Sequence, residues 1–64
     1  MKINGKTVAV KSGTLLLELL LEQGYDPTRI AVERNGEISP RSAYGQTVLQ
    51  ETDVLEIVRF VGGG

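Results

Sequence analysis

The chain has 64 residues, of which 41% are apolar and 23% are charged, and it contains neither cysteine nor histidine. This composition is typical of one small folded domain without disulfides, and it excludes a thiolate nucleophile and an imidazole base. Seven basic and eight acidic residues give a net charge of −1, so no broad electrostatic attraction to nucleic acid or an anionic membrane is expected. We therefore expect no enzyme, no metal site and no bound cofactor, but a protein whose partners are other proteins.

The N-terminal residues 1–5 contain no apolar run resembling a signal peptide. No segment of the sequence is long and apolar enough to suggest a membrane span. The expected location is the cytoplasm.

The first strand signal is the pair Asn4-Gly5 between two strand-like runs, residues 1–3 and 6–11. Asn-Gly is the strongest short-range hairpin signal, because both positions of the turn need a positive φ angle. The sequence therefore predicts an antiparallel hairpin. In its second strand Val8 and Val10 share one face, which the two-residue period assigns to the core.

A helix is expected over residues 15–23, after Ser12 and Gly13 interrupt the strand pattern. Thr14 is a plausible N-cap, since its hydroxyl oxygen can accept a hydrogen bond from an amide of the first turn. Gly24 suits the left-handed position that follows the last helical residue, and Pro27 lies where the helix can no longer continue.

Six leucines fill this predicted helix and cover more of its circumference than one sheet can bury. Leu16, Leu19 and Leu20 lie nearest the middle of the apolar arc, and Leu15 lies beside them. Leu17 and Leu21 drift to the far side, and we expect them to be partly exposed. The alternative is that the following loop covers them.

A second Asn-Gly pair, Asn35-Gly36, predicts a second hairpin between residues 30–35 and 37–38. Ile30 and Val32 point inward in this interpretation. Ser39 and Pro40 end the ladder, and residues 41–45 are expected to form an irregular or one-turn helical link. Residues 47–49 are interpreted as a short edge strand.

The longest strand pattern covers residues 54–61. Leu55 and Ile57 share the face toward the helix, whereas Val58 and Phe60 emerge on the open face beside the C-terminal residues. The predicted core comprises Val8, Val10, Leu16, Leu19, Leu20, Ile30, Val32, Leu49, Leu55 and Ile57.

The predicted element order is ββαβββ, which places the chain in the α+β class. Because the helix connects the first hairpin to the later strands, the last strand can enter the middle of the sheet beside the first. This is the ubiquitin-like β-grasp arrangement, a small mixed sheet packed against one main helix. We expect the domain to comprise residues 1–61, followed by a flexible glycine tail over residues 62–64.

The tail consists of Gly62, Gly63 and Gly64. Without side chains it could enter a narrow enzyme channel, and its terminal carboxylate is the one obvious chemical handle of the chain. The alternative interpretation is a frayed terminus without function.

Taken together, the residues resemble those of the thiamin-biosynthesis sulfur carriers, the ThiS family, over nearly the whole chain. The strength of the resemblance lies in the order of the matching segments. These are Ile3-Asn4-Gly5, Thr14-Leu15-Leu16, VERNGEI at residues 32–38, Pro40-Arg41, Val48-Leu49 and residues 53–64. Two departures are Thr52, where the family commonly has a glycine, and a third glycine in the tail.

The resemblance implies a function for the C-terminal diglycine, here Gly63 and Gly64, with Gly62 in a preceding small-residue position. A partner enzyme similar to ubiquitin-activating enzymes would use ATP to adenylate the Gly64 carboxylate. A sulfur-transfer protein would then supply sulfur for a thiocarboxylate, which thiazole synthase would consume. Partner contacts are expected at Val58, Arg59, Phe60 and Val61, with Arg59 helping to orient the tail.

Three other functions stay open at this point. The small subunit of molybdopterin synthase has the same fold, diglycine ending and thiocarboxylate, although such chains are usually longer. A protein modifier of the ubiquitin type would instead form a stable amide with target lysines. A pure interaction domain could carry the glycines incidentally.

Overall fold

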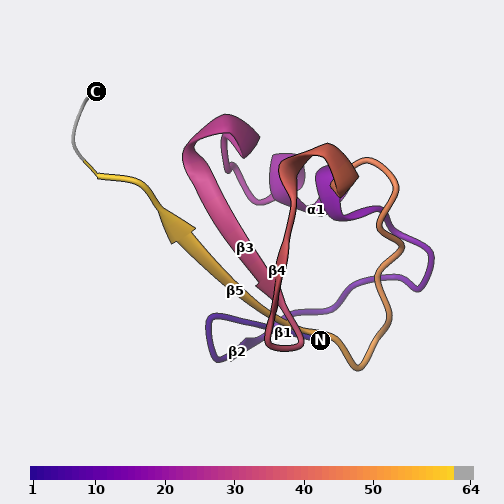
Figure 1. The fold of residues 1–64 in the computed structure, drawn as a ribbon. Helices are drawn as coiled ribbons and strands as arrows, with labels where there is room; N and C mark the ends of the chain where they lie inside the picture. Colours follow the sequence, from indigo (N-terminus) through magenta and orange to yellow (C-terminus); the bar gives the residue numbers. More distant parts are fainter. Residues whose placement is uncertain (62–64) are drawn as a thin grey trace.

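The computed structural model describes residues 1–61, which form a five-stranded sheet packed against one main helix (Figure 1). The helix, α1, covers Leu16–Glu22, and two short 3-10 helices cover Pro27–Arg29 and Arg41–Ala43. The strands are β1 (Lys2–Ile3), β2 (Lys6–Thr7), β3 (Ile30–Arg34), β4 (Glu37–Ser39) and β5 (Val54–Arg59). No helix within residues 1–61 is long and apolar enough to cross a membrane.

The strand order is β2-β1-β5-β3-β4, so the last strand of the chain lies in the middle of the sheet. β5 runs parallel to β1 and antiparallel to β3. The two hairpins flank it on either side (Figure 1). This confirms the predicted β-grasp arrangement, in which the helical crossover leaves room beside β1 for β5.

Both predicted hairpins are confirmed, and in each the Asn-Gly pair adopts positive φ angles. Asn4 and Gly5 have φ of 51° and 82°, and Asn35 and Gly36 have φ of 52° and 85°. The predicted second strand was too long, because it ends at Thr7. Val8 and Val10 are partly buried and pack against the core from outside it. The ladder pairs β2 with Lys2 and Ile3 only, and one further bond runs from the Val8 N–H to the Met1 carbonyl at 2.9 Å.

The helix is one residue shorter at each end than predicted, and the glycine signal after it is confirmed whereas the predicted N-cap is not. Gly24 has φ of 82°, and the N–H of Tyr25 donates to the carbonyl of Leu20 at 2.9 Å, as in a Schellman motif. The N-cap is Leu15, whose N–H donates to Glu18 Oε1 at 3.3 Å. The prediction of Thr14 was wrong because the Thr14 carbonyl accepts the N–H of Leu49, which holds this residue in the extended segment before the helix.

The predicted edge strand at residues 47–49 is also wrong. This segment makes one isolated bridge, between Val48 and Leu15, on the chain that enters the helix. Its backbone is used to hold the helix start, since the carbonyl of Thr47 accepts the N–H of Leu16 at 2.8 Å. The one-turn helical link before it is confirmed as the second 3-10 helix.

The core lies between α1 and one face of the sheet. Burial of the predicted residues Leu16, Leu19, Leu20, Ile30, Val32, Leu49, Leu55 and Ile57 is confirmed, and Ile3 and Tyr44 join them. Leu21 is 58% exposed, as expected for the far side of the helix. Leu17 is partly buried, because the chain at Tyr44 and Gly45 lies against it.

Candidate functional site

The end of β5 presents three exposed apolar side chains. Val58 is 60% exposed, Phe60 59% and Val61 96%, whereas Leu55 and Ile57 are buried on the helix side. The predicted division of the strand into a core face and an open face is therefore confirmed. The glycines predicted to act, Gly62, Gly63 and Gly64, lie outside the described residues.

The strand itself ends at Arg59, two residues before the predicted end. One further ladder bond follows, since the N–H of Phe60 donates to the carbonyl of Arg29 at 2.9 Å. This bond fixes the backbone up to Phe60, the position from which the chain continues toward its glycines.

Arg59 does not join the apolar side chains of the open face. Strand alternation places it on the same face as Ile57, and its guanidinium carbon lies 4.8 Å from the centroid of the Tyr25 ring. At this distance the cation interacts favourably with the aromatic ring. The four predicted contact residues are thus divided between two faces, with Val58 on one and Arg59 on the other.

The open face continues beyond β5 onto its neighbours. Val58 lies opposite Ala31 of β3, and Glu56 lies opposite Glu33, which is itself opposite Ile38 of β4. Ile38 is among the exposed apolar residues, as is Val54 at the start of β5.

Sequence reasoning missed the contribution of Ile38 to this face. The second Asn-Gly turn could have predicted it, because a two-residue turn at Asn35-Gly36 sets the hairpin register that pairs Ile38 with the outward-pointing Glu33.

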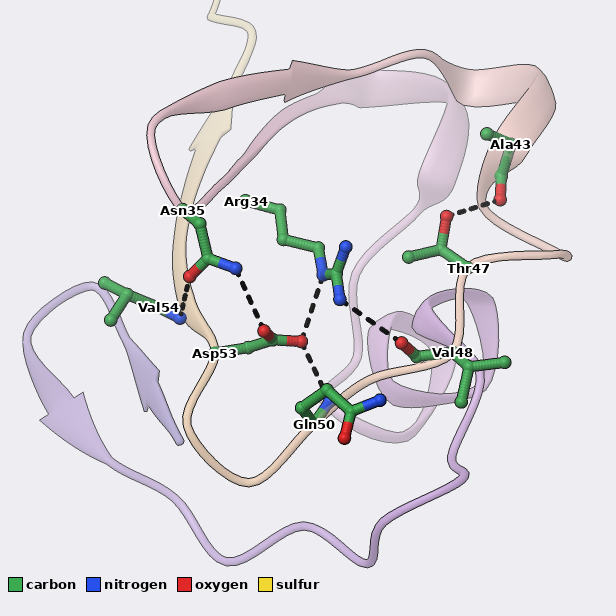
Figure 2. Close-up of polar contacts among 8 residues, drawn as sticks. All are labelled: Arg34, Asn35, Ala43, Thr47, Val48, Gln50, Asp53 and Val54. Atoms are coloured by element: carbon green, nitrogen blue, oxygen red, sulfur yellow. Dashed lines mark hydrogen bonds and ion pairs between the residues drawn. The ribbon is translucent and has the colours of Figure 1, made fainter.

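At the other end of β5 a buried carboxylate, Asp53, fixes the strand start (Figure 2). Its Oδ2 atom accepts hydrogen bonds from Arg34 Nε at 3.0 Å and from the Gln50 N–H at 2.8 Å, and its Oδ1 atom accepts one from Asn35 Nδ2 at 3.0 Å. Burial alone would raise the pKa of Asp53. The hydrogen bonds from Gln50, Asn35 and Arg34 outweigh burial and hold the pKa of Asp53 below its ordinary value.

Asn35 connects this carboxylate to the strand. Its Oδ1 atom accepts the N–H of Val54 at 2.9 Å (Figure 2). The backbone N–H of Asn35 donates to the Val54 carbonyl at 2.8 Å. Arg34 extends the network by donating to the carbonyl of Val48 at 3.3 Å. The second hairpin is thereby joined to the first residue of β5. No spacing in the sequence indicated this network.

The other Asn-Gly turn holds β5 further along. Asn4 Oδ1 accepts the N–H of Ile57 at 2.7 Å, and Asn4 Nδ2 donates to the carbonyl of Ile57 at 3.2 Å. Both turn asparagines therefore bond to the central strand. The strand is held at its start by Asn35 and near its end by the bond from Phe60 to Arg29, and the side chains of Phe60 and Val61 that follow it are exposed.

No group of three or more His, Cys, Asp or Glu side chains that could hold a metal ion occurs among residues 1–61. Asp53, the buried carboxylate of this part of the chain, is fully engaged in hydrogen bonds.

The family model described as the ThiS family matches residues 1–64. The sulfur carrier protein ThiS of Bacillus subtilis is 40% identical over 65 residues, which cover all of this chain and 98% of that protein. Thiazole synthase of Magnetococcus marinus is 45% identical over 62 residues. That match covers 97% of this chain, which spans only 19% of the length of that relative.

A solved structure supports the fold. The crystal structure of a thiamine biosynthesis protein (ThiS) from Geobacter metallireducens superimposes with a TM-score of 0.76 at 32% identity. The match covers 98% of this chain and 96% of that one.

Proposed function

This chain belongs to the ThiS family, and on that premise we propose that it is a sulfur carrier for the thiazole ring of thiamin. The cargo is a sulfur atom held as a thiocarboxylate on Gly64. The observation that carries the proposal is the end of β5, where a fixed strand leads through exposed Phe60 and Val61 into a sequence of glycines only. The carrier is a co-substrate of its partners and catalyses no step itself.

The chemistry begins with activation of the Gly64 carboxylate by a partner enzyme. One carboxylate oxygen attacks the α-phosphorus of ATP, pyrophosphate leaves, and an acyl-adenylate forms. A persulfide sulfur of a sulfur-transfer protein then attacks the carbonyl carbon, and AMP leaves. A thiol then attacks the sulfur that belongs to the sulfur-transfer protein, a new disulfide forms there, and the released sulfur remains on Gly64 as the thiocarboxylate. Thiazole synthase consumes this sulfur.

The proposed partners are an adenylating enzyme, the sulfur-transfer protein and thiazole synthase. The thiazole synthase relatives support the last of these, because a segment similar to this whole chain occurs within them. The use of ATP by the first partner places the carrier in the cytoplasm in this proposal. ATP is used by that partner and is not a cofactor of this chain.

The length of the tail locates the docking surface. Three residues span at most about 10 Å when extended, so the Gly64 carboxylate lies within that distance of Val61. An enzyme that closes around this carboxylate must therefore touch the end of β5. We assign this contact to Val58 and Phe60 on the open face and to Val61, which is also exposed, because exposed apolar and aromatic side chains commonly dominate such interfaces. Arg59 contributes by holding the strand end against Tyr25.

The test is partner-dependent exchange of pyrophosphate into ATP. A variant lacking Gly63 and Gly64 ends about 7 Å short of the enzyme's ATP site and should support no exchange. Its thermal melt should match that of the full chain, because no core residue lies beyond Ile57 among residues 1–61. Exchange by the truncated variant at the full rate would refute Gly64 as the reactive terminus.

A further inference from the structure

The second half of β5 has a neighbour on one side only. The hydrogen bonds of Val54 and Phe60 run to the β3 side, to Asn35 and Arg29. The hydrogen bonds of Leu55 and Ile57 run to the opposite side. There the Asn4 N–H donates to the Leu55 carbonyl, and the Asn4 side chain bonds to both the N–H and the carbonyl of Ile57. Because the direction of these bonds alternates along a strand, the N–H and carbonyl of Arg59 also point away from β3.

Nothing within residues 1–61 meets the backbone of Arg59 on that side. β1 pairs only with Val54 and Leu55, and Asn4 reaches no further than Ile57. Figure 1 shows β5 running on past the β1-β2 hairpin toward the chain end. A surface depression is lined by Asn4 and Tyr25, among others, the two residues whose side chains contact Ile57 and Arg59.

We propose that this free edge of β5, at Arg59, is a site for strand addition by an extended segment of the adenylating enzyme. The inference rests on the proposed function and adds the mode of recognition. The added segment would accept a hydrogen bond from the Arg59 N–H and donate one to the Arg59 carbonyl.

Two features favour this occupant. The tail residues carry no side chains, so an enzyme can hold them in register only through backbone hydrogen bonds, as a paired strand does. The tail is also short, at about 10 Å, so a segment that pairs with it necessarily passes beside Arg59. A paired strand would fix both the direction and the reach of the Gly64 carboxylate.

The variant test uses Arg59→Pro with Arg59→Ala as its matched control. Proline removes the Arg59 N–H and blocks the edge, but it leaves the β3 ladder intact because that N–H points away from β3. Alanine removes the contact with Tyr25 and keeps the N–H. We expect Arg59→Pro to raise the Michaelis constant for the carrier in pyrophosphate exchange about tenfold over Arg59→Ala, the loss typical of an unmet backbone bond.

Equal Michaelis constants for the two variants, with wild-type exchange intact, would overturn the strand addition and leave the sulfur-carrier function standing. Failure of the wild-type chain to support exchange would refute the function itself. Val58→Pro serves as the orientation control, because its N–H belongs to the β3 side, so this variant should be less stable than Arg59→Pro in chemical denaturation. A Val58→Pro variant at least as stable as Arg59→Pro would contradict the assigned bond directions.

Amide hydrogen exchange of the wild-type chain gives a second test that needs no variant. In the free carrier the Phe60 amide should be protected and the Arg59 amide should exchange fast. Addition of the adenylating enzyme with ATP should slow exchange at Arg59 at least tenfold. Unchanged exchange at the Arg59 amide in the complex would refute the proposal. Protection of this amide in the carrier alone, increasing with carrier concentration, would also refute it, because it would indicate pairing of two copies.

Discussion

The side-chain amide of Asn4 bonds to both backbone groups of Ile57, at 2.7 and 3.2 Å, in the way that the next residue of a strand would. β1 ends at Ile3, so without this contact β5 would lose its neighbour halfway along the sheet. The same residue forms the first turn, with φ of 51°. One asparagine thus sets the turn and extends the support of the central strand.

Replacement of Asn4 by glycine should therefore destabilise the fold. Glycine keeps the positive φ angle without strain, so the loss isolates the two hydrogen bonds to Ile57, about 1 to 3 kcal/mol of unfolding free energy. Asn4→Asp is the matched variant, because it keeps the acceptor for the Ile57 N–H and loses the donor. We expect an intermediate stability in urea unfolding. A glycine variant as stable as the wild type would show that these bonds contribute nothing.

Asp53 should make stability depend on pH in the acid range. Its pKa is lowered in the folded state, so its contribution is present in full above the ordinary value of 3.8 and is lost as pH falls through the lower folded value. Asp53→Asn should cost about 1 to 3 kcal/mol at neutral pH and flatten this acid response. Urea unfolding from pH 7 to pH 2 measures both effects.

The control for this titration is Asp26, whose pKa is also lowered, chiefly by the hydrogen bond from the Thr28 hydroxyl. Asp26 is exposed, so Asp26→Asn should leave most of the stability at neutral pH unchanged. An acid response that is identical in the wild type and Asp53→Asn would contradict the assigned role of the buried carboxylate.

The core predicts a sharp difference between two leucines of one helix. Leu19 is buried and Leu21 is 58% exposed. Leu19→Ala should lower the free energy of unfolding by about 2 to 5 kcal/mol, whereas Leu21→Ala should change it by less than about 0.5 kcal/mol. Chemical denaturation of the two variants measures this difference. Similar losses of unfolding free energy for both would mean that the core-facing side of the helix is not the one that contains Leu19.

The open face should contribute to binding and little to folding. Phe60→Ala removes a side chain that is 59% exposed, so we expect nearly unchanged stability and an affinity for the adenylating enzyme reduced about tenfold or more. Val48→Ala is the control, since Val48 is also exposed but lies outside the sheet, on the segment that bridges to Leu15. Titration calorimetry that gives the two variants equal affinity would remove Phe60 from the docking surface.

Local patterns sufficed to predict the elements whose signal is local. The two Asn-Gly turns, Gly24 after the helix and the alternation around Leu55 each specify their own structure. What was missed depends on contacts between distant segments. Thr14 lost its capping role to a bond with Leu49, and Tyr44 and Asp53 became buried through residues far away in sequence. The two-residue period of the strand accounts for Arg59 and Val58 lying on opposite faces, but it does not predict that the Arg59 guanidinium stacks on the Tyr25 ring.

The most direct measurement is the mass of the chain after incubation with ATP, the adenylating enzyme and a persulfide donor, followed by fragmentation to locate any change. The account predicts that one oxygen is replaced by sulfur and that the change lies on Gly64. It also predicts no change when ATP is omitted or when Gly63 and Gly64 are deleted. An unmodified terminus under complete conditions, or a branched conjugate through a lysine amide in its place, would contradict the sulfur-carrier function.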